Sequence, residues 1–365
     1  MQSSKNVYTE MLDVLKLTAP GTPLREGLEN VLRANTGGLI VFGEIDTIRP
    51  LMRGGFNIKA EYSPAHLYEL AKMDGAIILS ADGKQIISAN IHLTPDAMVP
   101  SSETGIRHRT AEQTARQTGA LVISISQRRN VISLYQGENK YVIKDVSVLL
   151  NMANQALGTL EKYKDALTEA LLRLSVQEFD NVVTLPDVLQ VVQRAEMFKR
   201  IENMLSGYII ELGDESHLIQ MQVDELRSNV DIDERLTIRD YMIREKGKDD
   251  NQVIDAFLET LSKYDNEDLF DFDLLTKGLN MGAFHDKEKR VTLEPRGYRV
   301  LNKIQRLPNS IIDNIVDVFG NLQEVVSATT DDLDDVVGVG PARARQISLG
   351  LERIRSQLIA ESNWT

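Results

Sequence analysis

The sequence of 365 residues contains no cysteine, which excludes disulfide bonds, thiolate metal ligands and a cysteine nucleophile. It also lacks any apolar run close to the roughly 18 residues that span a membrane. The first segment, MQSSKNVYTE, lacks the apolar core of a signal peptide. Together these absences predict a cytoplasmic protein that has no membrane partner.

Basic side chains are outnumbered by acidic ones in the middle of the chain. The net charge is -13 at pH 7, but residues 1–150 carry 16 basic and 15 acidic side chains. Residues 151–290 carry 17 basic and 29 acidic side chains, and residues 291–365 carry 8 and 10. The middle of the chain is therefore a poor candidate for binding nucleic acid, and the two ends are the candidates for anionic partners.

The first candidate functional cluster is Asp74-Gly75-Ala76, which leads directly into the apolar run Ile77-Ile78-Leu79. This run predicts a strand, so the carboxylate is expected where a strand begins. Glycine has no Cβ and alanine is small, so a flat base or a ribose could approach the backbone closely here. Asp-Gly is also a common turn dipeptide, and a plain turn is the alternative interpretation.

The second cluster is Arg107-His108-Arg109-Thr110, which follows Gly105 and precedes a helix-forming segment at residues 111–117. A helix N-terminus binds anions through free N–H groups and its dipole, and arginines add bidentate contacts to oxygen. A solvated basic turn is the alternative. The two clusters together indicate nucleotidyl transfer. The carboxylate can hold a divalent metal or take a hydroxyl proton, and the cationic cluster can bind a triphosphate.

Hydrophobic periodicity predicts three domains. Residues 1–146 are predicted to form an α/β (α+β) domain with a mixed sheet flanked by helices. Residues 147–290 are predicted to form an all-α helical spacer. The expected strands are 39–42, 77–80, 85–89, 121–126, 131–135 and 141–143. The expected helices are 10–17, 24–34, 64–72, 146–174 and 185–213. The loop at residues 91–104 is long enough to form one wall of a pocket.

Residues 291–365 predict an all-α domain that resembles a helix-hairpin-helix motif. Gly338-Val339-Gly340 forms the expected hairpin, and the second helix opens at Pro341, a favoured first helical position. Such a hairpin holds a phosphate through backbone N–H groups without reading sequence. A degenerate partner hairpin at residues 306–309 predicts a tandem pair. The alternative is a plain helical hairpin, which is favoured by the acidic residues Asp331, Asp332, Asp334 and Asp335.

These motifs, together with the segment LVISISQRRNVISLY at residues 121–135, resemble the bacterial diadenylate cyclases over the whole chain. The resemblance implies that two ATP molecules condense to cyclic di-AMP and two pyrophosphates, with Mg or Mn as the divalent cation. It assigns the metal to Asp74 and catalysis to Asp74, Gly75, Arg107, His108 and Arg109.

The resemblance also implies two sets of binding residues. The nucleotide-binding set is Gly75, Ala76, Leu93, Ile106, Arg107, His108, Arg109, Thr110, Ser126, Arg128 and Arg129. Ser126, Arg128 and Arg129 are second-rank members, and a solvated hairpin tip is the alternative for the two arginines. The DNA-binding set is Gly338, Val339, Gly340, Arg343 and Arg345.

Each ATP must present its 3'-hydroxyl to the α-phosphate of the other, so two nucleotides must face each other around a two-fold axis. One chain offers half of such a site, and this predicts face-to-face cyclase domains in a homo-oligomer. The resemblance further implies an octamer, binding of branched double-stranded DNA such as recombination junctions, and lowered activity on binding, as a DNA-integrity checkpoint. The alternative is a non-catalytic ATP-sensing DNA-binding scaffold.

Overall fold

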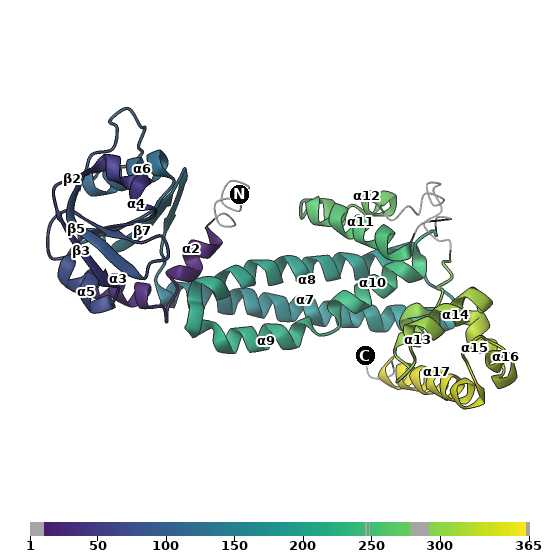
Figure 1. Ribbon diagram of the computed structural model, residues 1–365. Helices are drawn as coiled ribbons and strands as arrows, with labels where there is room; N and C mark the ends of the chain where they lie inside the picture. Colours follow the sequence, from purple (N-terminus) through teal and green to yellow (C-terminus); the bar gives the residue numbers. More distant parts are fainter. Residues whose placement is uncertain (1–10, 245–246, 248, 279–291, 363–365) are drawn as a thin grey trace. The chain divides into compact units, whose positions relative to one another are not determined.

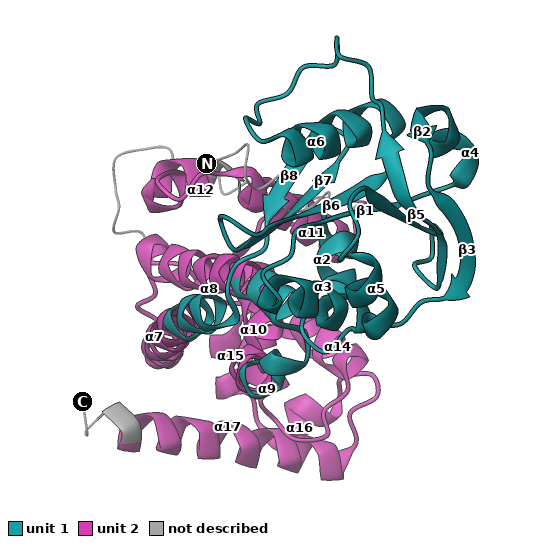
Figure 2. Cartoon of the chain, turned by 90° about the vertical axis from the view of Figure 1, so that its left-hand side faces the viewer, with its two compact units in different colours: residues 1–155, 205–221 teal, residues 156–204, 222–365 magenta. Residues whose placement is uncertain are grey.

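A computed structural model describes residues 11–244, 247, 249–278 and 292–362. The chain divides into two compact units (Figure 2). Unit 1 contains residues 1–155 and 205–221, and unit 2 contains residues 156–204 and 222–365. The predicted boundary between residues 290 and 291 lies outside the described residues, and the division into three domains stays a prediction.

Unit 1 is built on one mixed sheet, as the sequence predicts. Its strands run in the order β2-β5-β4-β1-β6-β7-β8, and β3 also pairs with β5. The pair β1 and β4 is parallel, whereas the other paired strands are antiparallel. The strands are β1 (Gly38–Phe42), β2 (Met52–Arg53), β3 (Phe56–Glu61), β4 (Ala76–Leu79), β5 (Gln85–Leu93), β6 (Leu121–Ser126), β7 (Val131–Gln136) and β8 (Asn139–Val142).

Helices cover both faces of this sheet, and every residue of β1 is buried as a result. Leu39 and Val41 belong to the core under α4 (Ile45–Ile48) and α6 (Ile106–Thr118). Ile40 and Phe42 pack in the opposite core with α2 (Leu12–Leu17), α3 (Pro23–Arg33) and α5 (Pro64–Leu70). Figure 1 shows the two layers of helices. Burial on both faces explains why this strand is apolar throughout rather than alternating.

The segment at residues 43–63 contains elements that the apolar pattern does not predict. It forms α4, the 3-10 turn Arg49–Leu51, β2 and β3. β3 has mostly exposed or half-buried side chains, because it pairs only with β5 at the margin of the sheet. Strand β5 also continues to Leu93, so the long loop begins at Thr94 rather than at residue 91.

Long helices dominate the middle of the chain, which confirms the predicted helical spacer. The helix predicted at residues 146–174 extends to Asp180, where Asn181 takes a left-handed φ of 56° and ends it. Among the described residues, no helix has both the length and the apolarity needed to cross a membrane. The helices are α7 (Val146–Asp180), α8 (Leu185–Leu212), α9 (His217–Arg227), α10 (Val230–Tyr241), α11 (Asp250–Lys263) and α12 (Phe272–Gly278), with 3-10 turns at Gly213–Ser216 and Asp268–Phe270.

The C-terminal part of unit 2 is all-α, as predicted, and has its own apolar core. Leu301, Ile315, Leu333 and Ile347 lie at its centre, each with no exposed surface. The helices are α13 (Tyr298–Asn302), α14 (Asn309–Phe319), α15 (Leu322–Ser327), α16 (Thr330–Asp334) and α17 (Pro341–Ser362).

Candidate active site

Strand register brings the predicted site residues to one edge of the sheet. Ile40 of β1 lies opposite Ile77 of the parallel strand β4, so both strands begin at the same edge. Gly38 lies opposite Ile125 of the antiparallel strand β6, so that strand ends there. Strand β5 ends there too, since Ala76 pairs with Ile91. This edge, hereafter the site edge, therefore gathers Asp74, Gly75, Ala76, Leu93 and Ser126.

Asp74 and Gly75 lie just before β4, against the backbone of β5. Gly75 has a φ of 95°, and a Cβ on it would lie 2.8 Å from the carbonyl carbon of Asn90. The Asn90 side chain donates a hydrogen bond to the Asp74 carbonyl over 3.0 Å. The neighbouring strand therefore occupies the space beside Gly75, and glycine is required for this packing.

The Asp74 carboxylate is exposed and has no hydrogen bond or ion pair among the described residues. In the same part of the chain, no group of three or more His, Asp or Glu side chains is placed to hold a metal. Mg²⁺ is often held by one or two carboxylates together with substrate phosphates. A single open carboxylate fits that mode of binding, and it does not fit a metal cage made by protein alone.

The second cluster opens α6, and its first cationic side chain reaches the site edge. Gly105 is the N-cap and has no side chain with which to cap the first turn. The Arg107 guanidinium lies against Gly37, immediately before β1, where an added Cβ would lie 1.9 Å from its Nη1. Ile106 and Arg109 are exposed, and Thr110 is half-buried. The helix start thus presents open backbone N–H groups and cationic side chains together.

His108 differs from its neighbours because it is buried under α6, with 8% of its surface exposed. Its Nδ1 lies 3.0 Å from the Tyr135 hydroxyl, and that hydroxyl donates to Glu103 Oε1 over 2.8 Å. Lys140 forms an ion pair with the same carboxylate. A tyrosine hydroxyl has one proton, so it must accept a hydrogen bond from His108 Nδ1–H. This relay, His108–Tyr135–Glu103–Lys140, leaves Nε2 as the unprotonated nitrogen of the neutral ring.

The electrostatics of the relay favour neutral His108. Burial lowers the pKa of His108, and the charges of Arg129, Lys140 and Arg107 lower it further against the opposing effect of Glu103. Burial opposes ionisation of Glu103, but hydrogen bonds from Lys140 and Tyr135 outweigh it and lower the pKa of that carboxyl. His108 Nε2 is buried without a hydrogen-bond partner among the described residues.

A further buried carboxylate, Glu112 on α6, holds the loop that precedes the helix. It accepts hydrogen bonds from Ser101 Oγ over 2.6 Å and from the Ser102 backbone over 3.0 Å. Arg116 pairs with Glu112 over 3.1 Å and donates to the Pro100 carbonyl over 2.9 Å. Sequence reasoning missed this residue and the partners of His108, although the Glu–Arg spacing of one helical turn was a visible signal.

The turn between β6 and β7 completes the site edge. Ser126 Oγ accepts a hydrogen bond from the Arg129 backbone over 3.2 Å, and Asn130 takes a left-handed φ of 52°. The side chains of Arg128 and Arg129 are exposed, and neither has an ion pair within the described part of the chain. The turn therefore supplies two unpaired cations beside Asp74 and Arg107.

The predicted DNA-binding hairpin is present in unit 2. Gly338 has a φ of 84°, Gly340 accepts the first hydrogen bonds of α17, and Pro341 is its first residue. Val339 is buried in the core of this domain, and its N–H bonds the Val336 carbonyl over 2.9 Å, so the structure gives it a packing role. Arg343 donates to the Gly338 carbonyl, whereas Arg345 is exposed.

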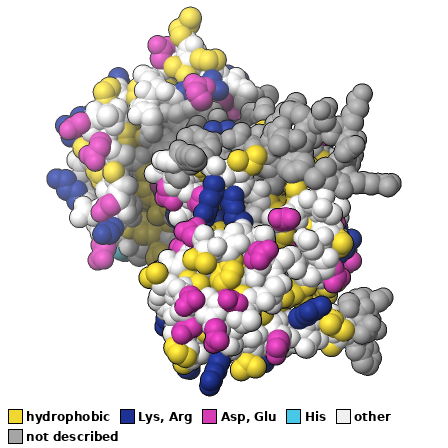
Figure 3. Space-filling model, turned by 90° about the vertical axis from the view of Figure 1, so that its right-hand side faces the viewer, with side chains coloured by type: hydrophobic (Ala, Val, Ile, Leu, Met, Phe, Trp, Pro, Cys, Tyr) yellow, Lys and Arg dark blue, Asp and Glu magenta, His cyan; other side chains and the backbone are white. Residues whose placement is uncertain are grey.

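The acidic residues beside this hairpin have a structural role at the start of α16. Asp332 accepts hydrogen bonds from the Thr329 backbone over 2.9 Å and from its hydroxyl over 2.6 Å, completing a capping box. Asp331 lies in the first turn, where a negative charge is favourable. Acidic side chains are visible on the face of the molecule in Figure 3.

Comparison with known proteins identifies the family. A model described as the DisA bacterial checkpoint controller nucleotide-binding domain matches residues 25–140, and one described as the DisA linker region matches residues 143–287. The DNA integrity scanning protein DisA of Carboxydothermus hydrogenoformans is 53% identical over 94% of this chain and 96% of its own length. Its namesake from Bacillus subtilis is 50% identical over 95% of each chain. The chain therefore belongs to the DisA family, and its N-terminal domain is a diadenylate cyclase.

Proposed function

We propose that two copies of this chain face each other through their site edges and condense two ATP molecules into cyclic di-AMP. Each 3'-oxygen forms a bond to the α-phosphorus of the opposite nucleotide, and each nucleotide loses pyrophosphate. The observation that carries this proposal is the gathering of Asp74, Arg107 and the 126–130 turn at one edge. One such edge supplies one carboxylate and one cationic cluster, which is half of a symmetric site.

In this proposal the exposed arginines bind the phosphates, and Asp74 holds the divalent cation. Arg107, Arg109, Arg128 and Arg129 neutralise charge that develops on the leaving pyrophosphate. Mg or Mn, when bound by Asp74 and phosphate oxygens, supplies further charge neutralisation and makes the 3'-hydroxyl more acidic. The exposed backbone of Gly75 lies beside the nucleoside, whereas Ala76 and Leu93 are buried in the core and support this wall from behind. Ile106 and Thr110 flank the phosphates.

The relay gives His108 a different role from that of the arginines. A neutral ring with Nδ1 protonated adds no positive charge to the cluster, and its Nε2 lone pair is a hydrogen-bond acceptor. We assign His108 to hold the first turn of α6, and hence Arg107 and Arg109, in the orientation that receives phosphate. Tyr135, Glu103 and Lys140 are positioning residues for it.

The test is incubation of purified protein with ATP and either Mg or Mn, followed by identification of products by mass spectrometry. Asp74→Asn is expected to fold normally and to lose most turnover, because it keeps the shape and loses the charge. Asp46→Asn changes an exposed carboxylate of α4 and serves as the matched control. Specific activity should also rise with protein concentration as copies associate. Full activity in Asp74→Asn or in a strict monomer would refute the corresponding part of the proposal.

We further propose that the tandem hairpins bind branched duplex DNA and that binding lowers cyclase activity in a DNA-integrity checkpoint. The left-handed Gly338 and the open N-cap Gly340 support backbone contact with phosphate. Titration with junction DNA should lower the rate of cyclic di-AMP formation, and replacing both glycines by leucine should weaken binding. A protein that binds ATP but yields no product with either metal would instead favour the sensor-scaffold function.

A further inference from the structure

The C-terminal domain contains an internal duplication that extends beyond the two hairpins. Leu301, Ile304 and Leu307 correspond at constant spacing to Leu333, Val336 and Val339, and all six are buried. Arg306 takes a left-handed φ of 59° at the position of Gly338, whose φ is 84°. The N–H of Ile312 bonds the Pro308 carbonyl over 3.1 Å, as the N–H of Ala344 bonds Gly340 over 2.9 Å.

The side chains that join the two halves are duplicated as well. Asn314 of α14 donates to the Val337 carbonyl of the second hairpin over 2.8 Å. Its counterpart Gln346 of α17 donates to the Gln305 carbonyl of the first hairpin. Each half therefore packs its long helix against the hairpin of the other half, which creates two equivalent surfaces.

The two equivalent surfaces carry opposite charge. Lys303 and Arg345 on one surface correspond to Asp335 and Asp313 on the other. Leu349 on the first corresponds to Asp317 on the second. The equivalence of the backbone ends at Phe319, where α14 stops, whereas α17 continues and carries Arg353 on the first surface alone. Within the equivalent part, the backbone does not explain the difference in charge, which follows the partner that each surface meets.

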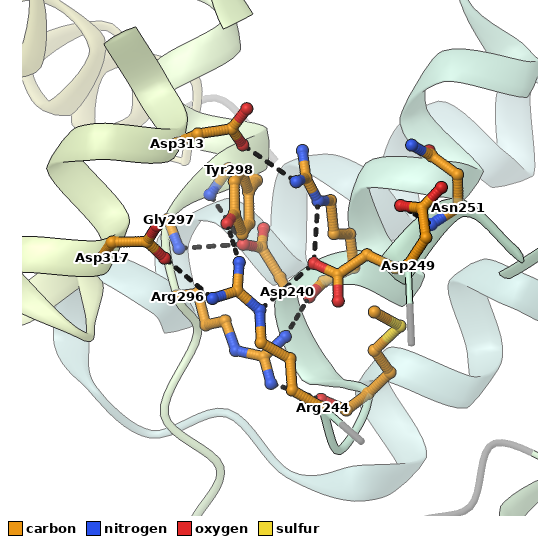
Figure 4. A network of polar contacts seen from close by, with 12 residues as sticks. Asp240, Arg244, Asp249, Asn251, Arg296, Gly297, Tyr298, Asp313 and Asp317 are labelled. Carbon is orange, nitrogen blue, oxygen red and sulfur yellow. Dashed lines mark hydrogen bonds and ion pairs between the residues drawn. The ribbon is translucent and has the colours of Figure 1, made fainter. Parts of the chain in front are cut away.

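The partner of the acidic surface is visible in unit 2. Asp313 pairs with Arg239 over 2.8 Å, and Asp317 pairs with Arg244 over 2.8 Å. Figure 4 shows both carboxylates of α14 directed at arginine side chains, close to Asp240 and Tyr298. The acidic surface thus attaches the C-terminal helices to the α10 region of the same unit.

The basic surface is an open groove of about 590 Å³ between residues 303–305 and α17. Its lining includes Lys303, Arg345 and Arg353, and no carboxylate lines it within the described part of the chain. Lys303 Nζ donates to Ser175 Oγ over 3.3 Å, and its charge adds to that of the two arginines. Neither Arg345 nor Arg353 has an ion pair among the described residues.

We infer that this groove carries the phosphate backbone of duplex DNA, as a second contact beside the Gly338–Gly340 hairpin. The inference rests on the proposed DNA binding and adds Arg353 and Lys303 to the residues that perform it. Charge complementarity supports a polyanion as the occupant, and the absence of acidic lining excludes a basic peptide. Such contacts fix position on the duplex and are independent of sequence.

The test compares Arg353→Gln and Arg345→Gln with Arg355→Gln in the full-length protein. Arg355 is exposed on the same helix but does not line the groove. Each groove variant is expected to weaken binding of a duplex or junction about tenfold. This is the lower end of the range of effects seen when one hydrogen bond to a charged group is lost. It should also reduce the slope of log affinity against log salt by about one, whatever the DNA sequence. The control should change neither quantity.

Different results separate the two proposals. Wild-type protein that binds no DNA at low salt would refute the proposed DNA function itself. If the wild type binds, and the glycine variants lose binding while both groove variants match the wild type, the groove is not a contact. An equal loss in Arg355→Gln would also overturn the inference, because it would show a general effect of charge. Thermal unfolding of each variant verifies that the exposed substitutions leave the fold intact.

Discussion

Tyr135 joins His108 to Glu103 across the core under α6. Its hydroxyl donates to Glu103 Oε1 over 2.8 Å and lies 3.0 Å from His108 Nδ1. Tyr135 is 1% exposed, so water does not compete for these contacts. The arrangement fixes both the orientation and the tautomer of the histidine, which no isolated surface histidine would have.

Replacing Tyr135 with Phe should remove the hydrogen bond that selects the Nδ1–H tautomer of His108, while the aromatic ring is kept. We expect kcat to fall by roughly tenfold to a hundredfold, the range for a small misplacement of site groups, with a smaller change in KM for ATP. Nitrogen NMR of the histidine rings should show the Nδ1–H form in the wild type and a mixture in the variant. His108→Asn identifies the resonance.

An outcome in which Tyr135→Phe keeps the Nδ1–H form would contradict the relay. Tyr141→Phe is a suitable control, because Tyr141 lies on the neighbouring strand β8, outside the relay. It should leave the His108 signal unchanged. A purely structural role of Tyr135 would lower stability but would not move the tautomer equilibrium.

The pKa of His108 predicts how stability changes with pH. Burial holds this pKa below its ordinary value of 6.5, so the unfolded chain binds a proton more readily than the folded chain. Stability from this group is therefore complete above pH 6.5 and is lost as pH falls toward the lower folded pKa. Denaturation of the wild type and His108→Gln between pH 7.5 and about 5 should show a steeper loss in the wild type. If the free energy of unfolding fell equally with pH in both proteins, the lowered pKa of His108 would be contradicted.

The sequence predicted the sheet well where apolar runs are continuous, as in β1 and β6. It did not indicate β3, because the alternating half-exposed residues of Phe56–Glu61 resemble a polar loop. The sequence did not indicate that His108 is buried, because the adjacent residues Arg107 and Arg109 are charged. The helical spacing of His108 with Ala111 and Ala115, both fully buried, was the signal that identifies its face.

The convergence of the site could be expected only in part. Each cluster was visible as a local motif, yet its position depends on strand register, which links residues far apart in sequence. The contact between Tyr135 and Glu103 joins two segments for which no local pattern exists. Long-range pairings of this kind follow from topology, and the chemistry of single residues does not specify them.

The close packing of Gly75 predicts a large effect of Gly75→Ala on stability. The added Cβ would lie 2.8 Å from the Asn90 backbone, in addition to the strain of a φ of 95°. We expect a loss of about 3 kcal/mol or more in the free energy of unfolding, since neither backbone moves freely. Gly119→Ala is the matched control, because Gly119 has a φ of 70° and no atom within 4 Å of its ideal Cβ.

The control should lose only about 1 kcal/mol, the contribution of a left-handed backbone alone. Denaturant titration monitored by circular dichroism measures both variants. Similar losses of unfolding free energy in the two proteins would mean that the β5 backbone moves to accommodate the new side chain. Glycine at position 75 would then be explained by the approach of a nucleotide, as the sequence alone suggested.

The buried ion pair of Arg299 and Glu178 predicts strong coupling between α13 and α7. Arg299 is 1% exposed and donates to Ser175 Oγ over 2.9 Å, and Glu178 accepts a hydrogen bond from Tyr241 over 2.8 Å. Arg299→Met should cost about 3–5 kcal/mol, because it leaves the Glu178 charge buried without its partner. The double variant Arg299→Met with Glu178→Gln should recover part of this loss, since the unpaired charge of Glu178 is then removed as well. A double-mutant cycle from denaturant unfolding measures the coupling, and strictly additive losses would show that the two side chains do not stabilise each other.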